Sequence, residues 1–277
     1  MSRRVQLNQR FFDLPILRGL GRSIHARRIA SQARSQSTAT RFFRNLRQLE
    51  ALQGPLAELA DGRAPLRILV AGCSFGCEAY SLAGFLAVRF PQLEWTIDAF
   101  DISRGAVAIA QRAVFGRKHG LADGFASDVQ PYAERMFERR GEEWAIVADI
   151  RQRVRVSHGD LLAEDFVADG AHDIVFAQNF LVHMDDKTAG QAFARIVATV
   201  KAGGALFVGG MNLDSKAELI KRHRLIPVDW QLEAIHDSDD MRRSAWPWDY
   251  WTLEPIDRSR PDFTTRYSTI FRIPDGA

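Results

Sequence analysis

The sequence has little cysteine, no long apolar run and no signal-peptide pattern. No stretch approaches the roughly 20 consecutive apolar residues that a membrane-spanning helix requires, and no apolar segment near the start precedes a small-residue cleavage site. These absences favour a soluble, cytoplasmic protein without a membrane span. The two cysteines, Cys73 and Cys77, have no Cys or His cluster elsewhere to join. We therefore expect reduced cysteines that pack in the core, with neither a disulfide framework nor a metal site.

Acidic residues are scarce at the start of the chain. Asp13 and Glu50 are the only acids among the first 50 residues, which contain 11 arginines, although the whole chain has a formal net charge of only +3. A basic arm of this kind suits an acidic partner protein, nucleic acid or a phosphorylated substrate. A solvated helical face is the alternative interpretation. We interpret residues 1–60 as a basic helical N-terminal segment that precedes the main domain at 61–277.

Apolar spacing alternates between strand and helix patterns over most of the chain. A hydrophobic share of 46% in 277 residues is enough for one domain with a large core. The alternation breaks over residues 116–150, where a crossover would need far fewer residues, so we expect a small inserted subdomain there. The predicted helices cover 40–59, 78–90, 103–115 and 187–201, and Gly203 and Gly204 are expected to cap the last of them. The predicted strands cover 68–71, 95–100, 154–156, 172–177 and 205–208. A closing antiparallel pair that includes 267–271 is expected near the end of the chain.

A strand, a glycine turn and a helix follow one another over residues 66–82. The apolar run at 68–71 is typical of a strand buried on both faces of a parallel sheet, and Gly72 and Gly76 mark the turn. A glycine turn allows the backbone to approach a ligand at the carboxyl end of the strand, where the free N–H groups of the helix also point. Gly72 is therefore a candidate ligand-binding residue.

Asp101 stands at the end of the next predicted strand. An acid about twenty to thirty residues after the glycine turn is where doubly wound folds hold a ribose hydroxyl. The chain lacks the Lys-Ser/Thr of a P-loop and the complete G-x-G-x-x-G of pyrophosphate binders. Glu78, in the first helical turn, would repel a pyrophosphate but pair with an ammonium group. S-adenosylmethionine, which has an α-ammonium, a ribose and no phosphate, fits these features best, and its product is S-adenosylhomocysteine.

Five segments, in order along the chain, resemble the motifs of a known family. Residues 40–44 resemble T-x-F-F-R, 71–81 resemble A-G-C-S-T-G-E-E-P-Y-S, and 101–103 resemble D-I-D/N-T. Residues 150–162 resemble I-R-x-x-V-x-F-x-x-x-N-L-L, and 178–184 resemble R-N-V-x-I-Y-F. Over about residues 38 to 212 the chain is therefore similar to the CheR-type chemotaxis receptor methyltransferases, which are S-adenosylmethionine-dependent protein-glutamate O-methyltransferases.

This resemblance implies an α/β, Rossmann-like class I methyltransferase fold, with a mostly parallel seven-stranded sheet flanked by helices. Glu78 would hold the ammonium of the cofactor, Asp101 the ribose hydroxyls and Asp160 the adenine amino group. Arg44 would pair with the methionine carboxylate or steer an acidic acceptor. The residues implied for the cofactor site, in addition to Gly72 of the glycine turn, are Thr38, Thr40, Arg44, Glu78, Asp101, Asp160, Leu161, Gln178 and Asn179.

Three departures from the family pattern bear on the methyl acceptor. Few residues precede Thr40 compared with the family's helical N-terminal domain, residues 209–212 read Gly-Gly-Met-Asn in place of G-H-S-E, and His183 stands at the tyrosine position. A glutamate acceptor is already ionised, whereas a hydroxyl or ammonium acceptor must lose a proton, which a histidine beside the methyl donor can take. His183 is accordingly a candidate catalytic base or, alternatively, a packing and hydrogen-bonding residue. Arg44 is the second catalytic candidate.

These observations leave three hypotheses for the function. The first is methyl transfer to an oxygen or nitrogen of a metabolite or of a non-receptor protein. The second is glutamate methylation of chemoreceptors, and the third is a non-catalytic sensor that binds the cofactor. Methylation of nucleic acid is not expected, because the N/D-P-P-Y/F motif is absent. The aromatic residues Trp246, Trp248, Tyr250 and Trp251 either form a lid over a small acceptor or close an edge of the core or a dimer contact.

Overall fold

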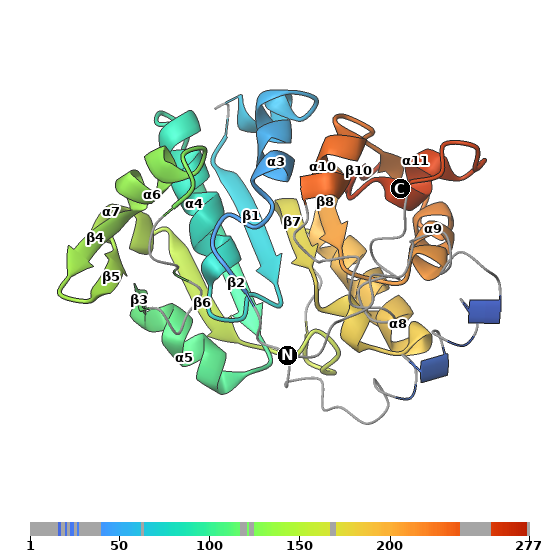
Figure 1. Ribbon diagram of the computed structural model, residues 1–277, viewed down its shortest axis with the longest axis horizontal. Coiled ribbons are helices and arrows are strands. Elements are labelled where there is room, and N and C mark those ends of the chain that lie inside the picture. Colours follow the sequence, from blue (N-terminus) through green and yellow to red (C-terminus); the bar gives the residue numbers. More distant parts are fainter. Residues whose placement is uncertain are drawn as a thin grey trace, which may run out of the picture.

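A mostly parallel sheet of seven strands forms the centre of the protein (Figure 1), with the order β6-β2-β1-β7-β8-β10-β9. The computed structural model describes residues 40–61, 64–116, 121, 125–166, 170–238 and 256–275, together with Ile16, Leu17, Leu20, Ser23, Ile24 and Arg27. β10 runs antiparallel to its neighbours β8 and β9, and the other pairs are parallel. The predicted Rossmann-like sheet is confirmed. Its strands are β1 (Leu66–Ala71), β2 (Trp95–Asp101), β6 (Val154–His158), β7 (His172–Gln178), β8 (Val200–Gly209), β9 (Ile226–Pro227) and β10 (Ile270–Arg272).

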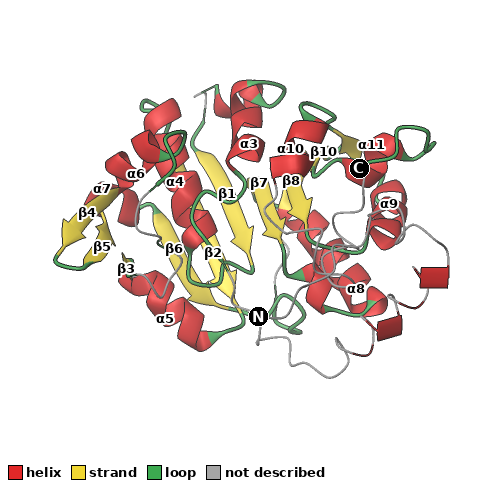
Figure 2. Ribbon diagram, in the orientation of Figure 1, coloured by secondary structure: helices red, strands yellow, loops and turns green. Residues whose placement is uncertain are grey.

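Helices flank the sheet on both sides (Figure 2). Within the described part of the chain, no helix is both long enough and apolar enough to cross a bilayer. The α-helices are α3 (Leu46–Leu49), α4 (Cys77–Arg89), α5 (Arg104–Arg112), α6 (Gln130–Met136), α7 (Ala148–Arg151), α8 (Asp186–Thr199), α9 (Leu213–Arg222), α10 (Leu232–Ser238) and α11 (Phe263–Tyr267). Short 3-10 helices are η1 (Glu50–Gln53), η2 (Ala57–Ala60) and η4 (Leu181–His183).

Alternate residues of the central strands pack against opposite faces of the sheet. Ile68 and Val70 of β1 belong to a core shared with α4 and with the segment 42–56. Leu69 and Ala71 belong to a second core, shared with α8 and α9. Because both faces of β1 are covered, nearly every position of the strand is apolar and buried.

The segment 40–59 does not form the single helix that its apolar spacing predicted. It forms α3, which continues directly into η1, and then η2 after a turn. Phe43 has a left-handed backbone with φ of 55°, and its N–H donates to Ser81 Oγ at 2.7 Å. Gly54 leaves the helical region with φ of −122° and ψ of −116°, and Pro55 has no N–H to donate. The spacing nevertheless predicted burial correctly, as shown by the buried residues Leu49, Leu52 and Leu56.

A small antiparallel sheet with the order β3-β5-β4 takes β4 and β5 from the segment predicted as an insertion, 116–150, and β3 from the two residues before it. The helix predicted over 103–115 ends at Arg112, because Ala113 is left-handed with φ of 54° and the next two residues form β3. Phe42 connects this sheet to the N-terminal segment, since its ring lies edge-on to Phe115 and Phe137 with centroid distances of 5.0 Å. The strands are β3 (Val114–Phe115), β4 (Phe137–Arg140) and β5 (Glu143–Ile146).

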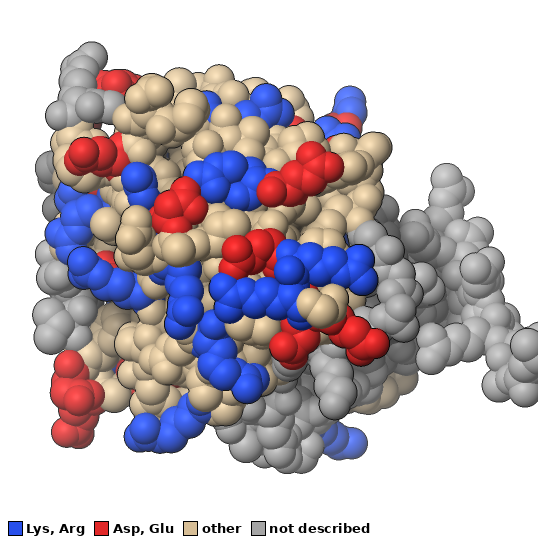
Figure 3. Space-filling view, turned by 90° about the vertical axis from the view of Figure 1, so that its left-hand side faces the viewer, with Lys and Arg blue, Asp and Glu red and all other residues tan. Residues whose placement is uncertain are grey.

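Basic and acidic side chains are interspersed on the face that carries the small sheet (Figure 3). Arg135 forms an ion pair with Asp149, and Arg140 forms one with Glu138. Exposed pairs of this kind contribute little to stability. We therefore interpret this face as a solvated surface of mixed charge. Most of the predicted basic arm, in contrast, lies outside the described residues.

The expectation that Gly203 and Gly204 cap a helix is wrong. α8 ends at Thr199, and Val200 is already extended, with φ of −89° and ψ of 136°. Both glycines lie within β8. A Cβ at Gly204 would lie 2.7 Å from the carbonyl oxygen of Asp173, so glycine permits a close approach where the register of β7 and β8 shifts.

The predicted antiparallel closure of the sheet is confirmed by β10. Ile270 pairs with Phe207 of β8, and Phe271 pairs with Leu206 of β8 and Pro227 of β9. The aromatic residues expected to form a lid or an edge closure, at positions 246, 248, 250 and 251, lie outside the described residues.

Replacing Phe42 by Ala is expected to lower the free energy of unfolding by about 3–5 kcal/mol, because it removes a buried ring between two aromatic neighbours. Urea unfolding followed by tryptophan fluorescence measures the change. Ile226→Ala is the control, since Ile226 is 53% exposed and its truncation should change little. Equal effects of the two substitutions would contradict the packing of Phe42 against the small sheet.

Candidate active site

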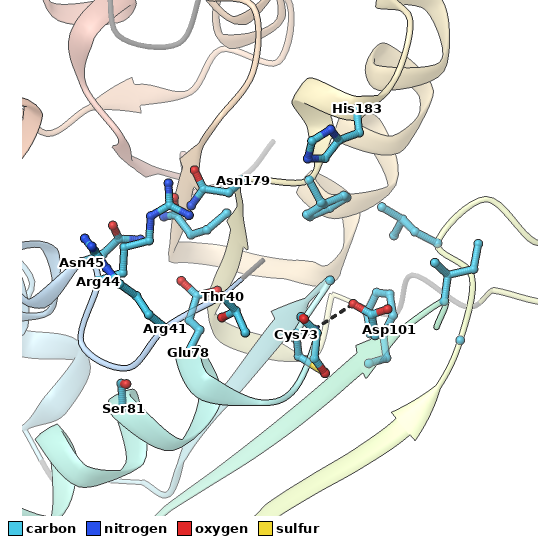
Figure 4. A pocket seen from close by; sticks show the side chains of 18 of the residues that line it. Thr40, Arg41, Arg44, Asn45, Cys73, Glu78, Ser81, Asp101, Asn179 and His183 are labelled. Carbon is cyan, nitrogen blue, oxygen red and sulfur yellow. Dashed lines mark hydrogen bonds between the residues drawn. The ribbon is translucent and has the colours of Figure 1, made fainter. Parts of the chain in front are cut away.

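A pocket opens at the carboxyl ends of β1, β2, β6 and β7 (Figure 4). Its empty volume is about 1200 Å³, the open mouth included. Residues from the first turn of α4, from the segment 40–49 and from the segment 180–184 complete the wall. Thr38 lies outside the described residues. The pocket brings together the other residues predicted for the site, which are Thr40, Arg44, Gly72, Glu78, Asp101, Asp160, Leu161, Gln178, Asn179 and His183.

The glycine turn after β1 depends on left-handed backbone conformations. Gly72, Ser74 and Gly76 have φ values of 70°, 50° and 85°. The N–H groups of Gly72 and Cys73 both donate to the carbonyl oxygen of Phe100, at 2.9 and 3.0 Å. These two hydrogen bonds hold the turn against the end of β2. The start of α4 then faces the pocket. Any residue other than glycine at position 72 would be strained.

Asp101 holds two backbone segments at the end of β2. The N–H of Ser74 donates to its Oδ2 and the N–H of Ser103 to its Oδ1, both at 2.8 Å. These bonds set the orientation of the carboxylate at the edge of the pocket. Each oxygen of a carboxylate can accept more than one hydrogen bond, so Asp101 retains capacity for ribose hydroxyls.

Glu78 points into the pocket from the first turn of α4 (Figure 4). Burial raises the pKa of its carboxyl to about 7, against the opposing effects of the Arg44 charge and a hydrogen bond from Asn45. An ammonium group bound beside it would favour the ionised carboxylate. Glu78 is therefore suited to a cationic ligand group.

Asp160 follows β6 in a turn that its own side chain stabilises. Its Oδ1 accepts a hydrogen bond from the Leu162 N–H at 2.9 Å. Gly159, just before it, donates its N–H to the carbonyl oxygen of Asp101 at 3.1 Å, which joins the two strand ends. Leu161 and Phe100 also line the pocket. A carboxylate at the rim of an apolar wall can accept a hydrogen bond from the amino group of a purine.

The ends of β7 and β8 approach each other closely at Gln178 and Asn179. Asn179 has φ of 60°, and its N–H donates to the carbonyl oxygen of Gly209 at 2.9 Å. Gly210 has φ of 66°, and a Cβ there would lie 2.5 Å from Asn179 Cα. The Gly-Gly sequence at 209–210 therefore permits this contact, which a larger residue at 210 would prevent.

Acidic and basic side chains lie close together in the pocket, since the charge of Arg44 acts on the Glu78 carboxyl. Figure 4 shows Arg41 near Glu78 in the lower part of the view, where Asp101 also lies, and Asn179 and His183 above them. His183 is the last residue of η4 and lines the pocket. The arrangement offers a ligand both carboxylates and positive or hydrogen-bonding groups.

The cysteines behave as packing residues, as predicted. Both are free and buried. Burial raises the pKa of the Cys73 thiol well above its usual range and that of Cys77 to about 12, so both stay protonated at neutral pH. Within the described ranges, no group of three or more His, Cys, Asp or Glu side chains is placed to hold a metal ion.

Several residues of the pocket were missed by the sequence analysis, among them Arg41, Asn45, Ser74 and Phe180. Arg41, Ser74 and Phe180 stand inside segments that resemble family motifs, and Asn45 directly follows one, so proximity to a motif was the available signal. Phe180 also packs against the glycine turn, since a Cβ at Gly72 would lie 2.7 Å from its ring. No local pattern indicates that contact.

The chain is similar to known methyltransferases over most of the domain that carries the pocket. Residues 38–224 match the family described as CheR methyltransferase, SAM binding domain. The probable biofilm formation methyltransferase WspC of Pseudomonas aeruginosa is 30% identical over 182 residues, which are 65% of this chain and 41% of the relative. A chemotaxis protein methyltransferase of Listeria monocytogenes is 29% identical over 171 residues, which are 61% of this chain and 63% of the relative. The chain thus spans less than two thirds of the length of either relative.

A solved structure with bound S-adenosylmethionine, the magnesium protoporphyrin IX methyltransferase ChlM of Synechocystis, aligns with a TM-score of 0.38 at 17% identity. The alignment covers 81% of this chain and 89% of that one.

Binding of S-adenosylhomocysteine is expected to strengthen as the pH rises through about 7, where Glu78 ionises. Below that pH the ammonium of the ligand meets a protonated carboxyl, so the affinity falls by up to about tenfold per pH unit. Calorimetric titration across this range measures the change. Glu78→Gln should abolish the pH dependence and hold the affinity at the weak, low-pH level. A wild-type affinity that is constant with pH would contradict an ionic contact between Glu78 and the ammonium.

Proposed function

The chain belongs to the CheR methyltransferase family, and from this premise we propose that it transfers the methyl group of S-adenosylmethionine to a side-chain carboxylate of a protein. Membership of the family makes the chain an S-adenosylmethionine-dependent methyltransferase. The chemical class of the acceptor is our inference from the pocket. The name of the Listeria relative, a chemotaxis protein methyltransferase, agrees with a protein acceptor.

The arginines that line the pocket carry this proposal. We assign the carboxylates of Glu78, Asp101 and Asp160 to the ammonium, ribose and adenine of the cofactor. Arg41 and Arg44 line the same pocket and supply positive charge beside these carboxylates. Positive groups attract a carboxylate and repel an ammonium group. The pocket therefore favours an anionic acceptor.

The remaining site residues have proposed roles on the cofactor side. Gly72 lets the backbone approach the methionine part, and Leu161 covers the adenine. Thr40, Gln178 and Asn179 supply hydrogen bonds near the methionine carboxylate. Thr38, outside the described residues, stays a candidate from the motif alone.

Methyl transfer to a carboxylate needs alignment more than acid–base chemistry. An oxygen lone pair of the carboxylate forms a bond to the methyl carbon while the bond from that carbon to sulfur breaks. The sulfonium becomes the neutral thioether of S-adenosylhomocysteine, the acceptor becomes a methyl ester, and no proton moves. The protein's task is to hold the two groups in line and to exclude water.

A second candidate function is methylation of a hydroxyl or amine on a metabolite or a non-receptor protein. Its support is His183, which lines the pocket where the family motif has tyrosine. An acceptor of this type loses a proton as the new bond forms, and the neutral imidazole would take it. A cofactor-binding sensor without turnover is the third candidate.

His183→Phe separates these candidates. A carboxylate acceptor needs no base. In that case we expect the variant to transfer label from methyl-labelled S-adenosylmethionine into protein of the source cells at a rate within about threefold of wild type. Loss of about a hundredfold or more, with unchanged binding of S-adenosylhomocysteine, would instead support a base-dependent acceptor. Cofactor binding by the wild-type protein without transfer to any fraction would support the sensor.

A further inference from the structure

A second pocket lies beside the first along the same edge of the sheet. The first pocket reaches from β6 to β7, whereas the second lies beyond β7, where β8 ends and β10 begins. Asn45 and Gln178 line both. The elements around the second pocket are α9, α10 and α11, and its empty volume is about 550 Å³, the open mouth included.

Gln178 belongs to a chain of hydrogen bonds that runs from the first pocket into the second. Its Nε2 donates to Gln48 Oε1 at 3.1 Å, and Gln48 Nε2 donates to Thr269 Oγ1 at 2.6 Å. Gln178 and Gln48 are only 7% and 4% exposed. Breaking a buried amide network of this kind is costly, so Gln178 has little freedom to reorient independently. A ligand on either side of Gln178 therefore acts on the same network.

Lys216 places a buried ammonium group in the wall of the second pocket. The residue is 2% exposed, and its Nζ donates to the carbonyl oxygen of Ser268 at 2.8 Å. His236 lines the same pocket, with its ring edge-on to Tyr267 at a centroid distance of 5.8 Å. The described lining residues include these two basic groups and no Asp or Glu. The ammonium group of Lys216 therefore favours an anion over a cation in this pocket.

Apolar and hydroxyl side chains complete the second pocket. Met211, Leu213 and Ile235 are almost fully buried in its wall. Thr269 accepts a hydrogen bond from Gln48, so its own hydroxyl proton points elsewhere. An anion that suits this mixture has acceptor oxygens at one end and a short apolar chain. The carboxylate of a short organic acid has both.

We propose that the second pocket binds a carboxylate, anchored by Lys216 and Thr269, while the cofactor occupies the first pocket. This site is separate from the methyl-transfer position and does not depend on the chemical class of the acceptor. The carboxylate has two possible sources, a second acidic group of the acceptor or a free organic acid. In either case Gln178 couples the two pockets, so carboxylate and cofactor change each other's affinity by the same factor.

The test is calorimetric titration of glutarate into the wild-type protein loaded with S-adenosylhomocysteine. Lys216→Met keeps the apolar stem and removes the charge, and we expect it to weaken glutarate binding at least about tenfold. Lys201→Met is the matched control, because Lys201 pairs with Asp173 near the amino end of β7, and it should bind glutarate as wild type does. Equal binding by the two variants would overturn the proposal.

A second measurement keeps the test decisive if Lys216→Met does not fold. Glutaramide has the shape of glutarate without its charge, and we expect the wild-type protein to bind it at least about tenfold more weakly. Glutaramide that binds as well as glutarate would overturn the proposal. So would glutarate that binds only in the absence of S-adenosylhomocysteine, because it would then occupy the first pocket.

Steady-state transfer to the acceptor distinguishes the two sources. Glutarate that competes with the acceptor indicates that the acceptor's own second acidic group fills the pocket. Glutarate that changes the turnover rate without competing indicates a free organic acid. Glutarate binding is measured without methyl transfer. The proposal for the second pocket can therefore hold even if the acceptor is not a carboxylate. The proposed carboxylate acceptor can likewise hold even if glutarate does not bind.

Discussion

The two hydrogen bonds to Asp101 are the interaction on which the cofactor side of the pocket depends. They tie the glycine turn after β1 and the start of α5 to the end of β2. The turn is left-handed at Gly72, Ser74 and Gly76, and its N–H groups return to the carbonyl oxygen of Phe100. The same carboxylate that holds this backbone in place faces the pocket. One side chain therefore fixes the local backbone and also occupies the position that we propose for ribose binding.

The charged side chains of the pocket suit a ligand that carries charge. Glu78 approaches the pocket from α4 and has a pKa raised to about 7 by burial, so it gains from a cationic partner. Arg44 comes from the N-terminal segment, and its charge acts on the Glu78 carboxyl. His183 comes from η4, and Asn179 closely approaches Gly209 and Gly210 at the end of β8. The carboxylates complement a cationic cofactor, and the arginine complements an anionic acceptor.

The site residues that could be predicted are those marked by a pattern of neighbouring residues in the sequence. Gly72, Glu78 and Asp101 each lie near the end of a buried strand, and parallel strands bring their ends to one edge of the sheet. Apolar spacing over 40–59 predicted burial correctly but not the helix, because Gly54 and Pro55 break the repeat. The second pocket had no local signal, since its hydrogen-bond chain joins residues 130 and 221 positions apart.

The measurement that tests the central claim most directly is the chemical stability of the transferred methyl group. Protein of the source cells is labelled with the wild-type chain and methyl-labelled S-adenosylmethionine, then treated with mild alkali. A carboxylate acceptor predicts label in the protein fraction that alkali releases as methanol, because a methyl ester hydrolyses. Label that stays bound after alkali, or that accumulates in small molecules, would contradict the account and favour an amine or hydroxyl acceptor.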